Sequence, residues 1–198
     1  MRGQHAPEST SKNKKLDNAR DIFIIGCETG LRISDLKRLS EENIIEDQGD
    51  RFIKIEMRKT EKSVTIPISL RVEEIFIKNK KQTENIFPKA ISDQKMNDYI
   101  KEISSKIDIL KEPVSFTTTI NDKRISISKA KFELITNHTA RRSFATNAVI
   151  KGISRTLIMG ITGHKTEKSF NRYIRMDELE IAKQFKIEND KGNMLRAV

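Results

Sequence analysis

The amino-acid sequence predicts an α+β domain that is mainly α-helical and carries a small antiparallel β-sheet. Apolar residues recur at helical spacing along much of the chain, and two neighbouring segments alternate apolar with polar residues as half-buried strands do. With 198 residues, 36% of them hydrophobic, and only 8 glycines and 4 prolines, the chain is long enough and apolar enough to bury a core.

The chain is predicted to begin with a polar segment outside the folded domain. Residues 1–15 contain almost no apolar side chains, so we expect a flexible leader or linker there. The folded domain itself is expected over residues 16–198, with folding starting near Leu16.

The first helix is expected over residues 17–27, because apolar side chains occupy most of its sides. Gly30 is expected to end it in the left-handed conformation that favours glycine. Ser34 and Asp35 are typical of helix N-caps, and they predict a short second helix directly after a tight turn.

A small antiparallel sheet is predicted from three short segments, at residues 44–45, 52–57 and 64–68. In the last two, apolar residues alternate with charged, hydroxyl or proline residues. Lys59 falls in the turn between them, and Pro67 favours a place near the sheet edge because proline cannot donate to a ladder.

The second half of the chain is predicted to be helical apart from one hairpin. Strands rich in threonine and serine at residues 114–128 are expected to turn around Asn121 and Asp122. Helical spacing and N-cap residues predict helices at residues 70–80, 92–107, 139–151, 154–159 and 177–187.

The charge balance favours a polyanionic partner. Lysine and arginine total 38, aspartate and glutamate total 28, and the net charge of +10 gives a pI near 9.7. Such an excess is most often found in proteins that bind nucleic acid. A basic protein of ribosomal type or a membrane-surface binder would share it, so charge alone does not identify the partner.

The cysteine count and the lengths of the apolar runs indicate the compartment. The single cysteine, Cys27, excludes an intrachain disulfide, and its apolar surroundings favour a buried thiol in a reducing, cytoplasmic setting. No apolar run approaches the roughly 18 residues that span a bilayer, so no membrane partner is expected. The cysteine and histidines show no zinc spacing, and no metal is expected.

Six scattered side chains together suit an attack on a phosphodiester without a metal ion. Each is ordinary alone, because a histidine at a helix start is more often a cap and an exposed arginine is more often solvated. As a set they supply two guanidinium groups, two imidazoles, an ammonium group and a phenol, from Arg32, Lys59, His138, Arg141, His164 and Tyr173.

The two arginines fit the charge that develops during in-line displacement at phosphorus. A guanidinium group binds two non-bridging oxygens at once, which an ammonium group cannot do, so Arg32 and Arg141 are the candidate phosphate ligands. His138 lies three residues before Arg141, so a helix start brings both side chains to one face, where the helix dipole also attracts phosphate.

The remaining groups fit a nucleophile, its helpers and an acid. A tyrosine has a pKa of about 10 and attacks only with a cation or base beside it, so Tyr173 is the candidate nucleophile, with His138 and His164 as helpers. The departing alkoxide needs a proton, for which Lys59 is the candidate donor. Nearby cations that leave this last assignment open are Lys54, Arg58 and Lys62.

These residues lie in motifs that resemble the catalytic domain of the tyrosine recombinase (phage integrase) family, particularly integrases of Bacteroides-type mobile elements. The resemblance spans most of the chain, and the joint pattern is far more specific than any single motif. Its motifs, in the family's order, are residues 29–35 with Arg32, 59–68 with Lys59, 138–147 with His138 and Arg141, and His164 followed nine residues later by Tyr173.

The resemblance implies a tyrosine recombinase catalytic-domain fold and site-specific DNA recombination in the integration or excision of a mobile element. Tyr173 would form a 3′-phosphotyrosyl bond to double-stranded DNA and release a 5′-hydroxyl, with the other five residues around the phosphate and Lys59 as general acid. The covalent link conserves the bond energy, so no ATP, metal or other cofactor is expected. Asp35 is expected to orient its basic neighbours.

The resemblance also implies partners. Family members place a helical core-binding domain ahead of the catalytic domain, and we expect that domain to be absent from this chain. They act as homo-oligomers, tetramers on DNA, and a monomer is expected without DNA. The last helix, residues 177–187, resembles the segment that family members dock onto a neighbouring protomer.

Two other functions stay open at this point. A type IB topoisomerase shares the chemistry but relaxes supercoils as a monomer, and a catalytically inert DNA-binding accessory protein would keep the motifs as relics. Tyr99, the only other tyrosine, lies on an apolar helical stripe that favours a structural role. Basic residues that contact the DNA backbone or are merely solvated are Lys12, Lys14, Lys15, Lys37, Arg38, Arg124, Lys129 and Lys131.

Overall fold

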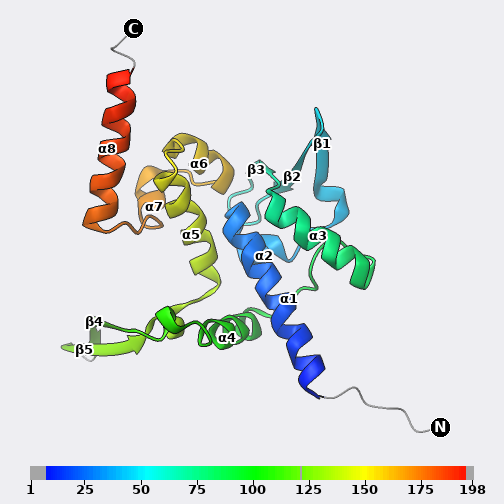
Figure 1. The fold of residues 1–198 in the computed structure, drawn as a ribbon, viewed down its shortest axis with the longest axis horizontal. Helices are drawn as coiled ribbons and strands as arrows, with labels where there is room; N and C mark the ends of the chain where they lie inside the picture. The colour runs from blue at the N-terminus through cyan, green and yellow to red at the C-terminus, as the bar shows by residue number, and fades with distance from the viewer. Residues whose placement is uncertain (1–7, 121, 195–198) are drawn as a thin grey trace.

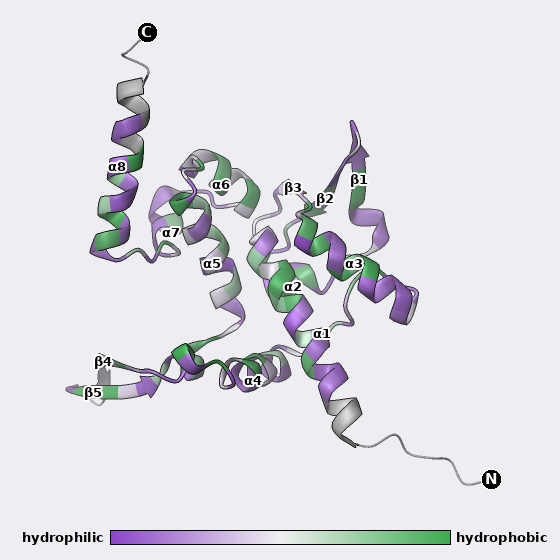
Figure 2. Ribbon diagram, in the orientation of Figure 1, coloured by the Kyte–Doolittle hydropathy of each residue, from purple (hydrophilic) through white to green (hydrophobic). Residues whose placement is uncertain are grey.

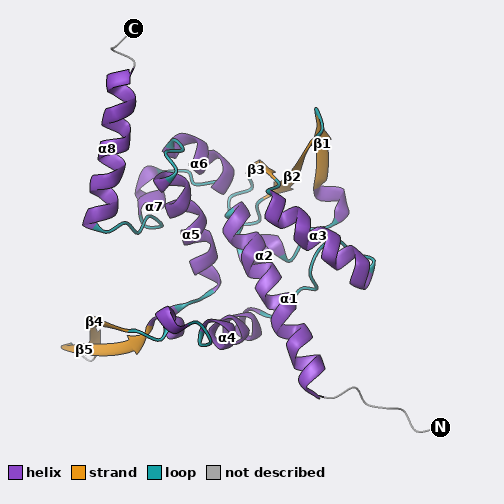
Figure 3. Ribbon diagram, viewed as in Figure 1, coloured by secondary structure: helices purple, strands orange, loops and turns teal. Residues whose placement is uncertain are grey.

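The computed structural model describes residues 8–120 and 122–194, and most of them are helical (Figures 1 and 3). The predicted fold class is confirmed, because helices surround two small antiparallel sheets. None of the helices in these ranges has the length and apolar composition that crossing a bilayer requires. In chain order, the helices and strands are α1 (Glu8–Thr29), α2 (Ile33–Leu36), β1 (Ile44–Asp47), β2 (Asp50–Glu56), β3 (Ser63–Pro67), α3 (Leu70–Thr83), α4 (Asp93–Ser104), β4 (Pro113–Ile120), β5 (Lys123–Ala130), α5 (Asn137–Ile150), α6 (Arg155–Thr162), α7 (Glu167–Asn171) and α8 (Glu178–Met194).

Helix α1 runs through the middle of the molecule and contacts α3, α4 and α5 (Figure 1). It runs from Glu8 to Thr29, which corrects the expected helix bounds of 17–27, and Leu16 is a buried residue of it. Lysine, glutamate and serine are tolerated in a solvated helix, so a polar segment can extend a helix whose later turns are packed. Residues 1–7 of the expected leader lie outside the described residues.

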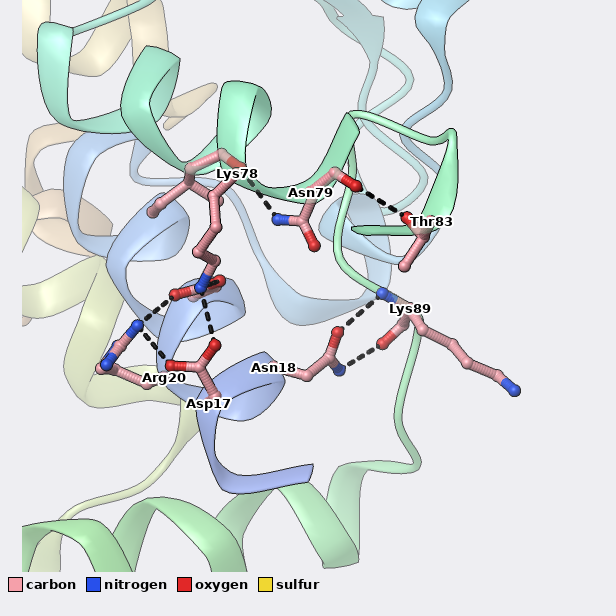
Figure 4. Close-up of polar contacts among 9 residues, drawn as sticks. Asp17, Asn18, Arg20, Lys78, Asn79, Thr83 and Lys89 are labelled. Atoms are coloured by element: carbon pink, nitrogen blue, oxygen red, sulfur yellow. Dashed lines mark hydrogen bonds and ion pairs between the residues drawn. The ribbon is translucent and has the colours of Figure 1, made fainter. Parts of the chain in front are cut away.

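A polar network fastens α1 to α3 and to the loop that precedes α4 (Figure 4). Asp21 is 1% exposed and forms an ion pair with Lys78 of α3, which also pairs with Asp17 at 2.8 Å. Asn18 accepts a hydrogen bond from the backbone N–H of Lys89 at 2.9 Å and donates one to its carbonyl at 2.8 Å. Because a buried carboxylate requires a cation, Lys78 ties α3 to α1.

The three predicted strands form one sheet in the order β1-β2-β3, with both neighbouring pairs antiparallel. Alternate residues of β2 and β3 form its buried face, and Ile53, Ile55, Val64 and Ile66 are at most 4% exposed. They pack in one cluster with residues of α1 and α3. Pro67 ends the edge strand β3, as predicted.

The predicted hairpin is confirmed as a separate two-stranded sheet of β4 and β5. Asp122 takes a φ of 60° in its turn, in the left-handed region that aspartate tolerates. The hairpin projects from the helical body (Figure 1), and Phe116 and Ile125 remain exposed. Its surface is therefore largely in contact with solvent.

The C-terminal third packs around α5, α6 and α7. Ala145, Val149, Ile158 and Phe170 are buried together in this part of the molecule. Helices α5 and α6 confirm the predicted segments, with α6 extended to Thr162. The sequence does not predict α7, because five residues are too few for a helical period to show.

The last helix, α8, stands apart from the α5–α7 unit (Figure 1), and apolar and polar residues alternate along it (Figure 2). Asp177 caps it as predicted, because its carboxylate accepts from the N–H of Glu180 at 2.8 Å and the Glu180 carboxylate accepts from the N–H of Asp177 at 3.0 Å. Leu179 and Phe185 are exposed. Docking of α8 onto a neighbouring protomer stays a prediction.

Cys27 lies near the end of α1 and is partly rather than fully buried. Burial, followed by the negative charge of Glu28, raises the pKa of its thiol to about 12. The thiol is therefore protonated at neutral pH and is a poor nucleophile.

Candidate active site

Two threonine–glycine pairs end the helices that lead into the candidate site. Thr29 and Thr162 each donate a hydroxyl hydrogen bond of 2.7 Å to the carbonyl four residues earlier. Gly30 and Gly163 then take φ values of 66° and 65°, in the left-handed region. The chain leaves α1 and α6 abruptly at these points, and the loops that carry candidate residues begin there.

Arg32 follows the first of these turns and is the N-cap residue of α2. This corrects the predicted caps, because Ser34 and Asp35 lie inside the helix. The reason is the turn itself, which gives Arg32 the extended backbone that an N-cap requires, with φ −74° and ψ 152°. The Arg32 side chain is half-buried, and its Nη1 donates to Met57 Sδ at 3.8 Å.

Asp35 is fully buried between α2 and the turn that joins β2 to β3. Its Oδ1 accepts a hydrogen bond from the backbone N–H of Arg58 at 3.0 Å and lies 3.7 Å from Arg38 Nη1. The carboxylate therefore holds the backbone just before Lys59 against α2.

Lys59 is exposed in the turn between β2 and β3. The turn is closed by a hydrogen bond of 3.0 Å from the N–H of Met57 to the carbonyl of Lys62. Met57 is buried beneath the turn, and a Cβ added at Gly163 would collide with its sulfur. The turn that presents Lys59 thus packs directly on the end of α6.

Arg141 lies in the first part of α5 and is only 1% exposed. Its guanidinium donates to the carbonyls of Gly30 and Thr162, each at 2.5 Å, and its Nη2 lies 3.4 Å from His164 Nε2. Among the described residues, Arg141 Nε is buried without a hydrogen-bond acceptor. One donor of this cation is therefore left for a further oxygen.

His164 directly follows Gly163 and is buried. Its Nδ1 lies 2.7 Å from Thr162 Oγ1. Two aromatic rings pack on the imidazole at steep interplanar angles, with centroid distances of 5.5 Å to Phe170 and 4.7 Å to Tyr173. These contacts leave the ring little freedom to rotate.

Tyr173 follows α7 and is half-buried. Its N–H donates to the carbonyl of Phe170 at 2.8 Å, and its carbonyl accepts from Thr146 Oγ1 at 3.2 Å. The centroid of its ring lies 5.4 Å from Arg141 Cζ, which is within cation–π range. Its backbone is thus fixed from both sides, and its ring lies against Arg141 and His164.

Burial and neighbouring charges lower the pKa values in this region. Burial, then the positive charge of Arg32, lower the pKa of Arg141 to about 10, so it stays charged at neutral pH. Burial, then Arg141 and Arg32, lower the pKa of His164 to about 4. Partial burial lowers the pKa of His138, helped in order by Arg142, Arg141, Arg32 and Lys59. Both imidazoles are therefore neutral at pH 7.

His138 and Arg141 differ in environment more than their spacing indicates. His138 is exposed as the second residue of α5, whereas Arg141 points inward. The difference follows from packing, because α5 lies against α1. His138 lies at the start of α5, whereas Arg141 lies about one turn further along, where the helix is covered by its neighbours.

The six predicted residues meet where the end of α1, the β2–β3 turn, the start of α5 and the α6–α7 region come together. Arg141, His164 and Tyr173 touch one another. Arg32 contacts Met57, whose sulfur lies against Gly163 just before His164, and its charge acts on both Arg141 and His164. Lys59 and His138 are the exposed members, close enough for Lys59 to lower the pKa of His138. Their individual roles stay predictions.

Residues 6–180 match the sequence pattern of the Phage integrase family. The chain belongs to the phage integrase family. The tyrosine recombinase resemblance is confirmed at this level, and the particular likeness to integrases of Bacteroides-type elements stays a prediction.

Solved recombinases share the fold of this phage integrase domain. The XerA recombinase is 14% identical, with a TM-score of 0.57 over 95% of this chain and 66% of that one. A lambda integrase dimer bound to a COC′ core site is 16% identical, with a TM-score of 0.55 over 87% and 59%. The Tn1549 transposon integrase in complex with circular intermediate DNA is 14% identical, with a TM-score of 0.52 over 92% and 64%. Likeness at these identities is a likeness of fold.

The integrase domain is shorter than these recombinases. The chain spans between 59% and 66% of the length of these three structures. Comparison with curated protein sequences gives no significant match.

Two residues that organise the integrase site escaped the sequence analysis, Thr162 and Met57. Thr162 binds Arg141 through its carbonyl and His164 through its hydroxyl. The signal for it was the repeat of threonine–glycine at two helix ends. Met57 continues the alternation of β2 and is buried, but nothing in its spacing shows that its sulfur meets Arg32.

The basic side chains expected to contact the DNA backbone differ in whether protein groups already bind them. Protein oxygens already bind three of them, Lys37, Arg38 and Lys131. Within the described ranges, those that are exposed and form no hydrogen bond or ion pair are Lys14, Lys15, Arg124 and Lys129. The side chain of Lys12 lies outside the described residues.

Proposed function

We propose that the chain is the catalytic part of a site-specific DNA recombinase that cuts and rejoins strands through a 3′-phosphotyrosyl intermediate, in the integration or excision of a mobile element. The observation that carries the proposal is the mutual contact of Tyr173, Arg141 and His164, with Arg32 beside them. Membership in the phage integrase family supports the same reaction class.

Arg141 is suited to bind the scissile phosphate. A buried donor without an acceptor costs about 1–3 kcal/mol, and a phosphate oxygen at Nε would remove that cost. Two carbonyls hold the guanidinium in place before DNA arrives, so binding requires little reorganisation of the cation. Arg32 supplies a second guanidinium for the charge that develops on the non-bridging oxygens.

In the cleavage step, the phenol oxygen of Tyr173 attacks phosphorus while the bond between phosphorus and the 5′ oxygen breaks. The phenol proton passes to the neutral imidazole of His138, whose lowered pKa keeps a lone pair available at pH 7. His164 helps through its contacts with the Tyr173 ring and with Arg141. The ammonium group of Lys59 protonates the departing 5′ oxygen. Attack by another 5′-hydroxyl reverses these steps and conserves the phosphodiester bond energy.

The same proposal includes the partners of the enzyme. A core-binding domain joined ahead of this chain would complete a clamp around double-stranded DNA, and the greater length of the similar recombinases supports it. Protomers are expected to form a tetramer on paired sites and a monomer without DNA. Adding the core-binding domain should raise affinity in a salt-matched titration, and equal affinity would contradict this part.

The deciding experiment uses a nicked suicide duplex that carries the end sequence of the element, followed by denaturing electrophoresis. The wild-type chain joined to its core-binding domain should give a covalent protein–DNA adduct, and Tyr173→Phe should give none. Tyr99→Phe is the matched control, because Tyr99 packs with α1 and α4 in a different cluster, and it should keep the adduct. A wild-type protein without any adduct, or an adduct that survives in Tyr173→Phe, would refute the proposal. Relaxation of supercoiled DNA without paired sites would instead favour a type IB topoisomerase.

A further inference from the structure

We infer that Thr162 is a positioning residue that fixes the proton of His164 on Nδ1 and so presents Nε2 as a hydrogen-bond acceptor to Arg141. The catalytic consequence of this arrangement rests on the proposed recombinase function. The arrangement itself belongs to the chain without DNA and can be measured there.

The hydroxyl of Thr162 determines which nitrogen of His164 carries the proton. A hydroxyl has one hydrogen, and Thr162 Oγ1 donates it to the carbonyl of Ile158 at 2.7 Å, because a carbonyl can only accept. The same oxygen lies 2.7 Å from His164 Nδ1. With its hydrogen already used, Thr162 accepts at this second contact, so Nδ1 carries the proton.

The contact with Arg141, on the other side of the ring, favours the same tautomer. Its Nη2 lies 3.4 Å from His164 Nε2, and a guanidinium group only donates. Nε2 must therefore hold a lone pair. Two independent contacts thus select one neutral tautomer, and the doubly protonated ring would turn an N–H toward Arg141.

The charges around the ring act in the same direction. The two cations whose charges act on His164 are Arg141 and Arg32, and both disfavour an imidazolium. The rings of Phe170 and Tyr173 also contact the imidazole, and neither carries a carboxylate that would stabilise an imidazolium. The positioning hydroxyl therefore acts on a neutral imidazole over the whole physiological range.

Thr162 holds both members of this pair through two different groups. Its carbonyl accepts from Arg141 Nη2 at 2.5 Å, and its hydroxyl fixes the imidazole that contacts the same nitrogen. Thr162→Val removes only the hydroxyl and keeps the carbonyl and the shape. Only the longer contact with Arg141, at 3.4 Å, would then disfavour a proton on Nε2. The fraction of rings that carry the proton there should rise, and in that form the N–H opposes Arg141 and disturbs the phosphate-binding guanidinium.

The first test is nuclear magnetic resonance of the imidazole nitrogens of His164 in the ¹⁵N-labelled 198-residue chain at neutral pH. A His138→Asn variant assists the assignment among the three histidines. The wild type and Thr162→Ser should show Nδ1 protonated and Nε2 free, and Thr162→Val should weaken this preference, because only the longer contact with Arg141 then remains. Thr29→Val is the matched control, because Thr29 is an equally buried threonine with the same hydrogen bond but without a histidine.

The second test compares cleavage of the suicide duplex across pH. Thr162→Val should slow cleavage about five- to tenfold, the effect of one lost hydrogen bond, and should shift the acid limb of the rate profile, whereas Thr162→Ser should restore both. Thr156→Val, an exposed threonine of the same helix, should have no effect. Protonation of Nε2 in the wild type, or an unchanged tautomer in Thr162→Val, overturns the inference. Absence of any adduct with the expected tautomer would refute the recombinase function and leave the positioning role standing.

Discussion

Replacing Gly163 by alanine should destabilise the domain by about 2–4 kcal/mol. Gly163 ends α6 with a φ of 65°, where an alanine costs roughly 1 kcal/mol. Its new Cβ would also collide with the sulfur of Met57. Met57 is fully buried and cannot move into solvent, so the added methyl overpacks the site at a cost of about 1–3 kcal/mol.

The measurement is urea unfolding followed by far-ultraviolet circular dichroism, with Gly160→Ala as the control. Gly160 lies in the same helix with nothing within 4 Å of an added Cβ, so its replacement should stabilise the helix by up to about 1 kcal/mol. If Gly163→Ala is no less stable than the wild type while Gly160→Ala behaves as expected, the packing of Met57 on α6 does not constrain the site. The reasoning that links the Lys59 turn to the His164 loop would then fail.

Three further predictions concern charges and the thiol. Lys78→Met should cost about 2 kcal/mol, because it removes one cation from buried Asp21, whereas Lys80→Met, which breaks an exposed pair, should change unfolding by less than about 0.5 kcal/mol. Stability should fall as the pH drops from 6.5 to about 4, because unfolding lets His164 take up a proton that the folded state refuses until about pH 4, and His164→Asn should flatten this part of the unfolding curve against pH. Cys27 should react with iodoacetamide at pH 8 at least about tenfold more slowly in the folded chain than in urea, because its pKa is raised to about 12, and mass spectrometry can follow the reaction. Equal rates, an unchanged pH slope or equal losses in both lysine variants would contradict the respective argument.

The sheet and the helices were predictable because their signals are local. Ile53 and Ile55 alternate with charged residues on β2, which has one buried and one exposed face. A strand of this kind produces the period of two that sequence analysis detects. Ser92 and Asp177 are side-chain caps, whose chemistry lies within three residues of the helix they start.

Other features were not predictable because they depend on partners distant in sequence. The polar start of α1 has no apolar stripe, and its helicity continues from packed turns further along. The N-cap position of Arg32 depends on the turn at Gly30, and the burial of Arg141 depends on carbonyls more than 20 residues away on either side. Sequence patterns named the candidate residues but could not show which of them would be exposed.

The burial of Arg141 has a physical explanation in the two helix ends that meet there. The last carbonyls of a helix lack partners within it and form the negative end of its dipole. Arg141 bonds the carbonyl of Thr162, the last residue of α6, and that of Gly30, directly after α1, so both negative ends face one cation. A guanidinium held in this way stays charged without solvent, which is the condition under which it binds a phosphate most strongly. Gly30 and Gly163 end α1 and α6 at these points, and so they place the two carbonyls that hold the Arg141 guanidinium. The proposed strand cleavage depends on the position of that charge.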